Sequence, residues 1–83
     1  MNRRQLAAGT AVFSPGDPAE SFFVLLSGAV RFSPEAPRGS ATVQDPVFGL
    51  ADALLNRPRS YAATVSADCA LLEVTWSLDK LTV

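Results

Sequence analysis

The stretch FGLADALLNRPRSYAATV, residues 48–65, is the part of this sequence that decides its fold. It opens with a Phe-Gly pair and continues into an alanine- and leucine-rich segment, which favours a short helix over residues 51–55. Pro58 ends that helix, and a strand-like run follows Arg59-Ser60. A glycine turn, a helix start and a positioned arginine are the parts of an anion-binding cradle.

The chemistry of this stretch suits a phosphate group. Gly49 allows a positive φ or a close approach of the backbone, and the helix start offers unpaired N–H groups. Arg59 supplies a planar guanidinium that matches two phosphate oxygens, and Ser60 adds a hydroxyl or a backbone N–H. We therefore predict a phosphate-binding set of Gly49, Leu50, Ala51, Arg59 and Ser60. The alternative for Arg59 is a surface residue paired with Asp52, whereas Arg57 is expected to be solvated.

Strand signals dominate the rest of the chain. Residues 3–13 predict two short strands around a turn at Gly9, and residues 14–21 form a loop rich in proline and glycine. Two apolar strands hinged at Ser27-Gly28 follow, and the first of them is apolar enough to be buried on both faces. The remaining strands are predicted at 41–43, 61–66 and 69–75, with a turn near Ala67-Asp68 between the last two.

These elements predict a mainly β protein, a sandwich or barrel with one short internal helix. Ser77 is expected to cap a last helical turn through Leu81, and Trp76 to anchor a core or an interface. Tyr61 is expected to be a core or cross-strand residue. The predicted core comprises Phe13, Phe22, Phe23, Val24, Leu25, Leu26, Val30, Phe32, Val65, Leu71, Leu72 and Val74.

Composition excludes several classes of function. The chain of 83 residues is 48% hydrophobic and carries a net charge of −1, which argues against disorder and against nucleic-acid binding by this chain alone. It has no histidine and one cysteine, Cys69, which is expected to be a core residue, so neither a metal site nor a histidine-based catalytic site is predicted. No transmembrane or signal segment is evident, and we expect a cytoplasmic protein that makes no membrane contact.

Three segments together resemble the cyclic nucleotide-binding domain of catabolite-activator-type transcription regulators and cyclic-nucleotide-dependent kinases. LAAGTAVFSPGDPAESFFVLLSGAVRF looks like the opening half of that domain, and ATVSADCALLEV looks like its closing strand pair. FGLADALLNRPRS looks like the phosphate-binding cassette between them. The resemblance implies a jelly-roll barrel (a double-stranded β-helix), with residues 1–83 as a single domain.

The sequence departs from the family at the ribose end of the cassette. The resemblance implies a glutamate after Phe-Gly that binds the ribose 2′-hydroxyl, and that ribose-side position is Leu50 here. Leucine accepts no hydrogen bond, and Leu50 is expected to pack into the barrel and fill space that a nucleotide needs. Asp52 lies about 200° further around the helix, so it is expected to cap or solvate the helix start instead. Residues 1–83 also hold no counterpart of the family's N-terminal helices or its long C-terminal helix.

Two functions remain open at this point. The first is a non-catalytic sensor domain in signal transduction or transcription regulation, which binds cyclic AMP or a related phosphate-bearing nucleotide and needs no cofactor. The second is a degenerate jelly-roll module that no longer binds cyclic nucleotides and that assembles as a homo-oligomer or with a partner protein. A cupin-like enzyme would hold its metal with histidines, which the chain lacks.

Overall fold

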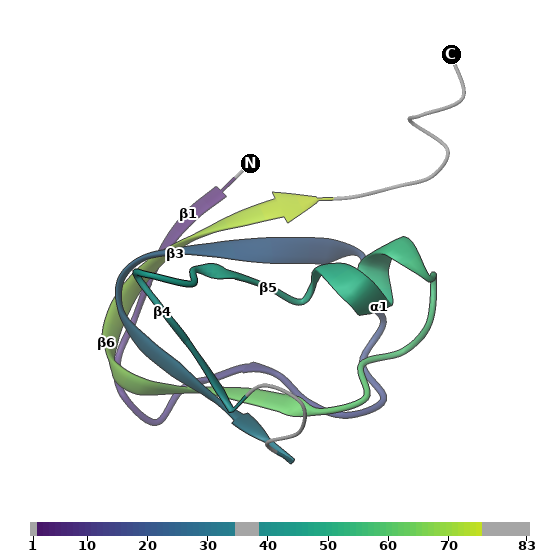
Figure 1. The fold of residues 1–83 in the computed structure, drawn as a ribbon, viewed down its shortest axis with the longest axis horizontal. Coiled ribbons are helices and arrows are strands. Elements are labelled where there is room, and N and C mark those ends of the chain that lie inside the picture. Colours follow the sequence, from purple (N-terminus) through teal and green to yellow (C-terminus); the bar gives the residue numbers. More distant parts are fainter. Residues whose placement is uncertain (1, 35–38, 76–83) are drawn as a thin grey trace.

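A computed structural model describes residues 2–34 and 39–75 of the chain. It is a jelly roll made almost entirely of antiparallel strands, with a short helix on the side opposite the bend of the two longest strands (Figure 1). The helix α1 (Leu50–Leu54) confirms the segment predicted over residues 51–55 to within one residue. The strands are β1 (Asn2–Leu6), β2 (Ala11–Phe13), β3 (Ser21–Ser33), β4 (Ser40–Thr42), β5 (Val47–Phe48) and β6 (Ala62–Thr75).

Two long strands frame the roll. β3 has 13 residues and β6 has 14, and they pair antiparallel from Ser21↔Thr75 to Ser33↔Ala62. The prediction that each would be two separate strands is wrong, because the ladder continues through the hinge with register shifts between Leu25 and Val30. The predicted turn near Ala67-Asp68 is likewise part of a continuous, bent β6.

Gly28 explains how the two strands bend together. Its φ is +84°, and a Cβ built on it would lie 2.3 Å from the carbonyl oxygen of Asp68 and 2.7 Å from Cα of Cys69. Only glycine allows the backbones of β3 and β6 to approach this closely at the bend. The Ser27-Gly28 hinge is therefore a point of strand curvature.

The bend divides the paired strands into two layers that face each other across the core (Figure 1). In one layer, β1 pairs with residues 69–73 of β6, and β5 pairs with Phe23 and Val24 of β3. In the other layer, β2 pairs with the start of β6, and β4 pairs with residues 29–31 of β3. The strand β5 was not anticipated from the sequence, and it delivers the chain directly into α1.

The core lies between the layers and is rich in phenylalanine. Phe23 and Phe48 stack with ring centroids 5.2 Å apart, and Phe13 and Phe32 join them within 6.3 Å of Phe48. Cys69 is buried, as predicted, and burial raises the pKa of its thiol. Seven predicted core residues are confirmed as buried: Phe13, Phe23, Leu25, Val30, Phe32, Val65 and Leu71.

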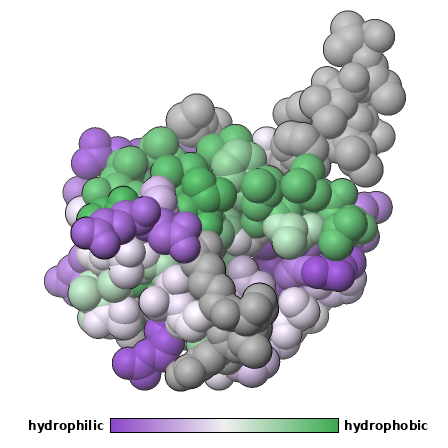
Figure 2. All heavy atoms as spheres, viewed as in Figure 1, coloured by the Kyte–Doolittle hydropathy of each residue, from purple (hydrophilic) through white to green (hydrophobic). Residues whose placement is uncertain are grey.

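The prediction that residues 22–26 are buried on both faces is wrong. Phe22 and Val24 are half-buried and alternate with buried neighbours, and Leu26 is 42% exposed. Leu72 and Val74, the ladder partners of Val24 and Phe22, are also half-buried. An antiparallel sheet needs cover on one face only, so these side chains belong to its outer face. Figure 2 shows an apolar band across the upper part of the face in view. Trp76 and the helical turn predicted from Ser77 to Leu81 lie outside the described residues.

Candidate ligand-binding site

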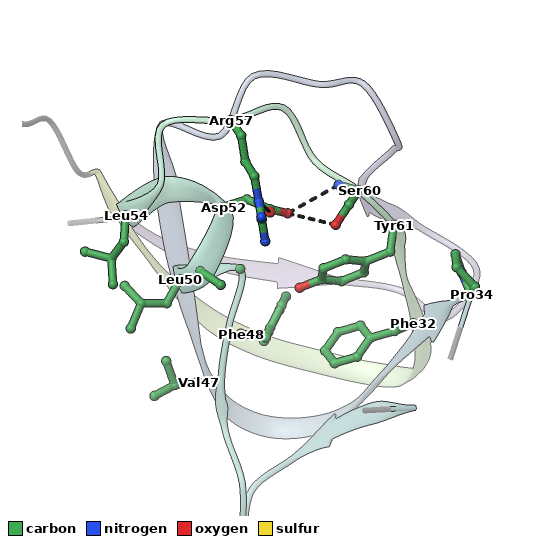
Figure 3. Close-up of a pocket in the computed structure, with 12 residues that line it drawn as sticks. Phe32, Pro34, Val47, Phe48, Leu50, Asp52, Leu54, Arg57, Ser60 and Tyr61 are labelled. Carbon is green, nitrogen blue, oxygen red and sulfur yellow. Dashed lines mark hydrogen bonds and ion pairs between the residues drawn. The ribbon is translucent and has the colours of Figure 1, made fainter. Parts of the chain in front are cut away.

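A cavity of about 550 Å³ opens between α1 and the end of the barrel (Figure 3). This volume falls within the range of small-molecule sites, about 300–1,000 Å³. Its charged and hydroxyl-bearing edge comprises Asp52, Arg57 and Ser60. Its aliphatic wall comprises Val47, Leu50 and Leu54, and its aromatic wall comprises Phe32, Phe48 and Tyr61. The cavity therefore suits a ligand with one charged end and an apolar or aromatic body.

The turn that ends α1 brings Arg57 back over the helix. Asn56 has a φ of +52°, a left-handed conformation that asparagine tolerates better than most residues. The backbone N–H of Arg57 consequently donates to the carbonyl oxygen of Asp52 at 3.1 Å. The Arg57 side chain then reaches the Asp52 carboxylate, with Nε 2.5 Å from Oδ1.

Asp52 is the polar centre of this edge. Only 2% of it is exposed, and its Oδ2 accepts from the backbone N–H of Ser60 at 3.3 Å and from the Ser60 hydroxyl at 3.4 Å. Burial by itself raises the pKa of the carboxyl group, but hydrogen bonds from Arg57 and Ser60 and the charge of Arg57 outweigh it. The pKa of Asp52 therefore lies below its ordinary value, and the group is a carboxylate at neutral pH.

Two expectations about this edge are wrong. Asp52 neither caps the helix start nor meets solvent, because the turn at Asn56 encloses it with donors. Arg57 is not simply solvated: its side chain is 53% exposed, but it forms the ion pair with Asp52 and lines the cavity. The pair is five residues apart, a spacing that a continuous helix does not bring together, so the sequence pattern gave no signal for it.

Arg59 lies on the other side of the same loop, in the interior. It is 3% exposed, and its Cζ lies 4.3 Å from the ring centroid of Phe13. One terminal nitrogen, Nη1, donates to the carbonyl oxygen of Gly49 at 2.6 Å, and the other, Nη2, donates to the carbonyl oxygen of Ser21 at 2.5 Å. Burial lowers the pKa of the Arg59 guanidinium, although nearby Tyr61 and Asp52 oppose that effect. An arginine still stays charged at physiological pH.

The backbone of Arg59 is held as firmly as its side chain. Its N–H donates to the carbonyl oxygen of Asp17 at 2.8 Å, and its carbonyl oxygen accepts from Gly16 at 2.8 Å. The Asp17 carboxylate in turn accepts from the N–H of Ser14 at 2.9 Å, which closes the predicted turn. Arg59 thus ties together the loop before β3, the first residue of β3 and the junction between β5 and α1.

Gly49 forms that junction and is required by its geometry. Its φ is +77°, which confirms the predicted positive φ, and it stands at the start of α1. A Cβ at this position would lie 2.9 Å from Nη1 of Arg59 and 3.3 Å from the ring of Phe23. The glycine therefore makes room for the buried guanidinium.

The structure brings most of the predicted phosphate-binding set to the cavity, but not all of it. Gly49, Leu50, Ala51 and Ser60 line the cavity, whereas Arg59 lies behind Gly49 and is not among its lining residues. Leu50 is half-buried and contributes to the aliphatic wall together with Val47 and Leu54 (Figure 3). The cavity remains open beside Leu50, so this leucine does not close it; its place relative to a bound ribose stays a prediction.

Tyr61 has two roles at the aromatic wall. Its ring meets Phe13 and Phe32 edge-on, with centroids 5.2 and 5.0 Å apart, which confirms its predicted place against the core. It also lines the cavity, and Figure 3 shows its hydroxyl directed into that space. A ligand in the cavity therefore meets the tyrosine directly.

The family of the chain follows from comparison with known proteins. The profile of the cyclic nucleotide-binding domain matches residues 3–77, which is nearly the whole sequence. The jelly roll, the position of α1 and the cavity beside it agree with that match. The chain belongs to the cyclic nucleotide-binding domain family.

The similarity extends to individual relatives. The chain is 26% identical to the cAMP-dependent protein kinase regulatory subunit of Yarrowia lipolytica and 27% identical to that of Candida albicans. Each alignment covers 99% of the present chain. It spans only 21% and 17% of those proteins. A solved structure described as Sp-2Cl-cAMPS bound to PKAR CBD2 has the same fold, with a TM-score of 0.77 and 21% identity. That alignment covers 89% of this chain and 51% of the other.

Two features are absent from the part of the chain that the structure describes. No helix in residues 2–34 and 39–75 has the length and apolar character needed to cross a bilayer. Within the same ranges, no three histidine, cysteine, aspartate or glutamate side chains gather as they would around a metal ion.

Proposed function

We propose that this chain is a non-catalytic sensor domain whose cavity beside α1 binds a cyclic nucleotide, with cyclic AMP as the first candidate. The observation that carries the proposal is the cavity itself. It has a charged and hydroxyl-bearing edge and an aromatic wall, and most of its lining comes from residues 47–61, the stretch whose sequence resembles the family's phosphate-binding cassette. The curated relatives are regulatory subunits of a cAMP-dependent kinase, which supports the same ligand class.

The mechanism of such a sensor requires an element whose position depends on the ligand. The helix α1 is the best placed, because it forms one side of the cavity and has only five residues. Ala51, Leu54 and Leu55 are exposed, so little packing holds this segment in place. A ligand between α1 and Tyr61 would therefore shift α1 and change the apolar surface around it, as expected of a cytoplasmic regulator.

Calorimetric titration with cyclic AMP and cyclic GMP tests the proposal, and 5′-AMP serves as a control with the same base and an open phosphate. We expect measurable heat and a raised melting temperature with at least one cyclic nucleotide, because a ligand that binds only the folded state stabilises it. Neither heat nor a thermal shift at millimolar cyclic nucleotide would exclude this function.

A second function is favoured by one specific observation. Val47, Leu54 and Leu55 are 37%, 46% and 62% exposed and lie on β5, on α1 and just after it. Exposed apolar side chains in such a group fit a homo-oligomer or a partner-protein interface. Light scattering at high protein concentration tests this alternative: it expects a mass above 8.8 kDa that Leu54→Ser and Leu55→Ser reduce, and a strict monomer would exclude self-association.

A further inference from the structure

The aliphatic wall of the cavity, Val47, Leu50 and Leu54, carries no polar side-chain atom. Val47 begins β5, and Leu50 and Leu54 are the first and last residues of α1. Figure 3 shows the three side chains gathered on one side of the cavity. They are accessible to a ligand, because Leu50 is half-buried and Val47 and Leu54 are 37% and 46% exposed. A ligand group that faces this wall therefore leaves water without gaining a hydrogen bond from a side chain.

The polar groups next to this wall are directed elsewhere. The Asp52 carboxylate is 2% exposed, accepts two hydrogen bonds from Ser60, and points toward Ser60 in Figure 3. The carbonyl oxygen of Gly49 faces the interior, where it accepts from the buried guanidinium of Arg59. Neither group supplies an acceptor for a ligand hydroxyl at the start of α1.

The chemistry of a 3′,5′-cyclic nucleotide makes this absence specific. Its sugar has one free hydroxyl, on C2′, because the oxygens on C3′ and C5′ belong to the phosphate ring. Its planar base favours an aromatic wall, which in this cavity comprises Phe32, Phe48 and Tyr61. The sugar then lies between the base and the phosphate and turns its C2′ edge to the aliphatic wall. A hydroxyl that is desolvated there without a partner weakens binding, whereas a hydrogen atom in its place does not.

We propose that Leu50 is a specificity-determining residue, through which the cavity selects cyclic nucleotides without a hydroxyl on C2′ over those that carry one. The aliphatic wall receives the C2′ edge of the sugar and gives it no hydrogen bond. The preferred ligand is thus of the 2′-deoxy class. The inference rests on the proposed function, because it requires a cyclic nucleotide in the cavity.

The test measures the dissociation constants of cyclic AMP and 2′-deoxy cyclic AMP for the wild-type chain by calorimetry. We expect 2′-deoxy cyclic AMP to bind about tenfold more tightly, since a desolvated hydroxyl without a partner costs about that factor. Leu50→Gln places an amide at the wall with little change in volume, and it is expected to reverse the preference.

Leu55→Gln is the matched control for this variant. Leu55 is 62% exposed, follows α1 directly and is not among the residues that line the cavity. The same leucine-to-glutamine change at this position is therefore expected to leave the wild-type ratio of the two dissociation constants unchanged.

Two results would overturn the inference while leaving the proposed function intact. The first is a wild-type chain that binds cyclic AMP as tightly as 2′-deoxy cyclic AMP or more tightly, as expected if Ser60 or Tyr61 bonds to the C2′ hydroxyl. The second is a folded Leu50→Gln variant that keeps the wild-type ratio.

If neither nucleotide binds, the proposed function fails, and the wall is tested with ribose 5-phosphate and 2-deoxyribose 5-phosphate. These sugar phosphates differ by the hydroxyl on C2. The methyl NMR signals of Val47 and Leu50 are then expected to shift at a lower concentration of the deoxy sugar. Equal concentrations, or no shift with either compound, overturn the inference.

The wild-type chain also decides the case in which Leu50→Gln does not fold. With 2′-deoxy cyclic AMP bound, nuclear Overhauser contacts are expected between the methyl groups of Leu50 and the protons on C2′. Contacts of these protons with Tyr61 alone would overturn the inference.

Discussion

Arg57 and Arg59 stand on either side of one proline, and their environments are opposite. Arg59 points into the barrel, where it is 3% exposed and donates to two carbonyl oxygens. The side chain of Arg57 is 53% exposed and pairs with a carboxylate at the cavity. The difference shows that the acceptors an arginine meets, more than its distance from a neighbouring arginine in the sequence, decide whether its side chain is buried or half exposed.

The largest expected effect is a difference in the free energy of unfolding between variants of the two arginines. Arg59→Gln leaves the carbonyl oxygens of Gly49 and Ser21 without their donors in a buried setting, and we expect a loss of about 3 kcal/mol in the free energy of unfolding. Arg57→Gln is the matched control and is expected to cost about 1 kcal/mol, because its side chain is half exposed. Urea denaturation of both variants measures the difference. Equal losses would mean that Arg59 does not hold the fold.

A smaller loss of stability is expected when Gly49, which lies against the guanidinium of Arg59, is replaced. Gly49→Ala places a Cβ 2.9 Å from Nη1 of Arg59 at a φ of +77°, so we expect a loss of about 2 kcal/mol from backbone strain and displacement of the guanidinium. Gly16→Ala has a similar φ of +90° with nothing within 4 Å, and is expected to cost about 1 kcal/mol from strain alone. If thermal denaturation shows no difference between them, the close packing of Arg59 against Gly49 is incorrect.

The smallest expected effect is a dependence of stability on pH that comes from the Asp52 carboxylate at the edge of the cavity. Arg57 and Ser60 hold the pKa of Asp52 below its unfolded value despite burial, and Arg59 and Tyr61 are the other titratable groups nearby. A carboxyl group with a lowered folded pKa contributes stability above its unfolded pKa and loses it as the pH falls through the folded pKa. The wild-type chain should therefore lose more stability than Asp52→Asn between about pH 5 and pH 2. Parallel pH profiles for the two chains would contradict the ion pair.

Much of the fold could be predicted because its signals are local. Gly49 at a positive φ, the short helix after it and the turn of residues 14–17 all follow from residue types at fixed spacing. The continuity of β3 and β6 could not be predicted in this way. It depends on how closely Gly28 approaches Asp68, forty residues along the chain.

The candidate site was harder to predict for the same reason. Phe-Gly and Pro-Arg-Ser located the cavity correctly, since Gly49 and Ser60 line it. The direction of Arg59 depends on the carbonyl oxygen of Ser21, which lies 38 residues away in sequence. The Asp52–Arg57 pair depends on the left-handed conformation of Asn56. Placing Asp52 by its angle around a regular helix could not include that turn. Contacts between residues that are distant in the sequence cannot be predicted from the residue pattern of one segment.

The most direct measurement is a crystal structure of the wild-type chain with cyclic AMP bound. The nucleotide should lie in the cavity beside α1, with its phosphate near Ser60 and the rest of the ligand against the wall that includes Tyr61. A nucleotide bound elsewhere on the chain, or a cavity that stays empty at a saturating concentration of cyclic AMP, would contradict the account.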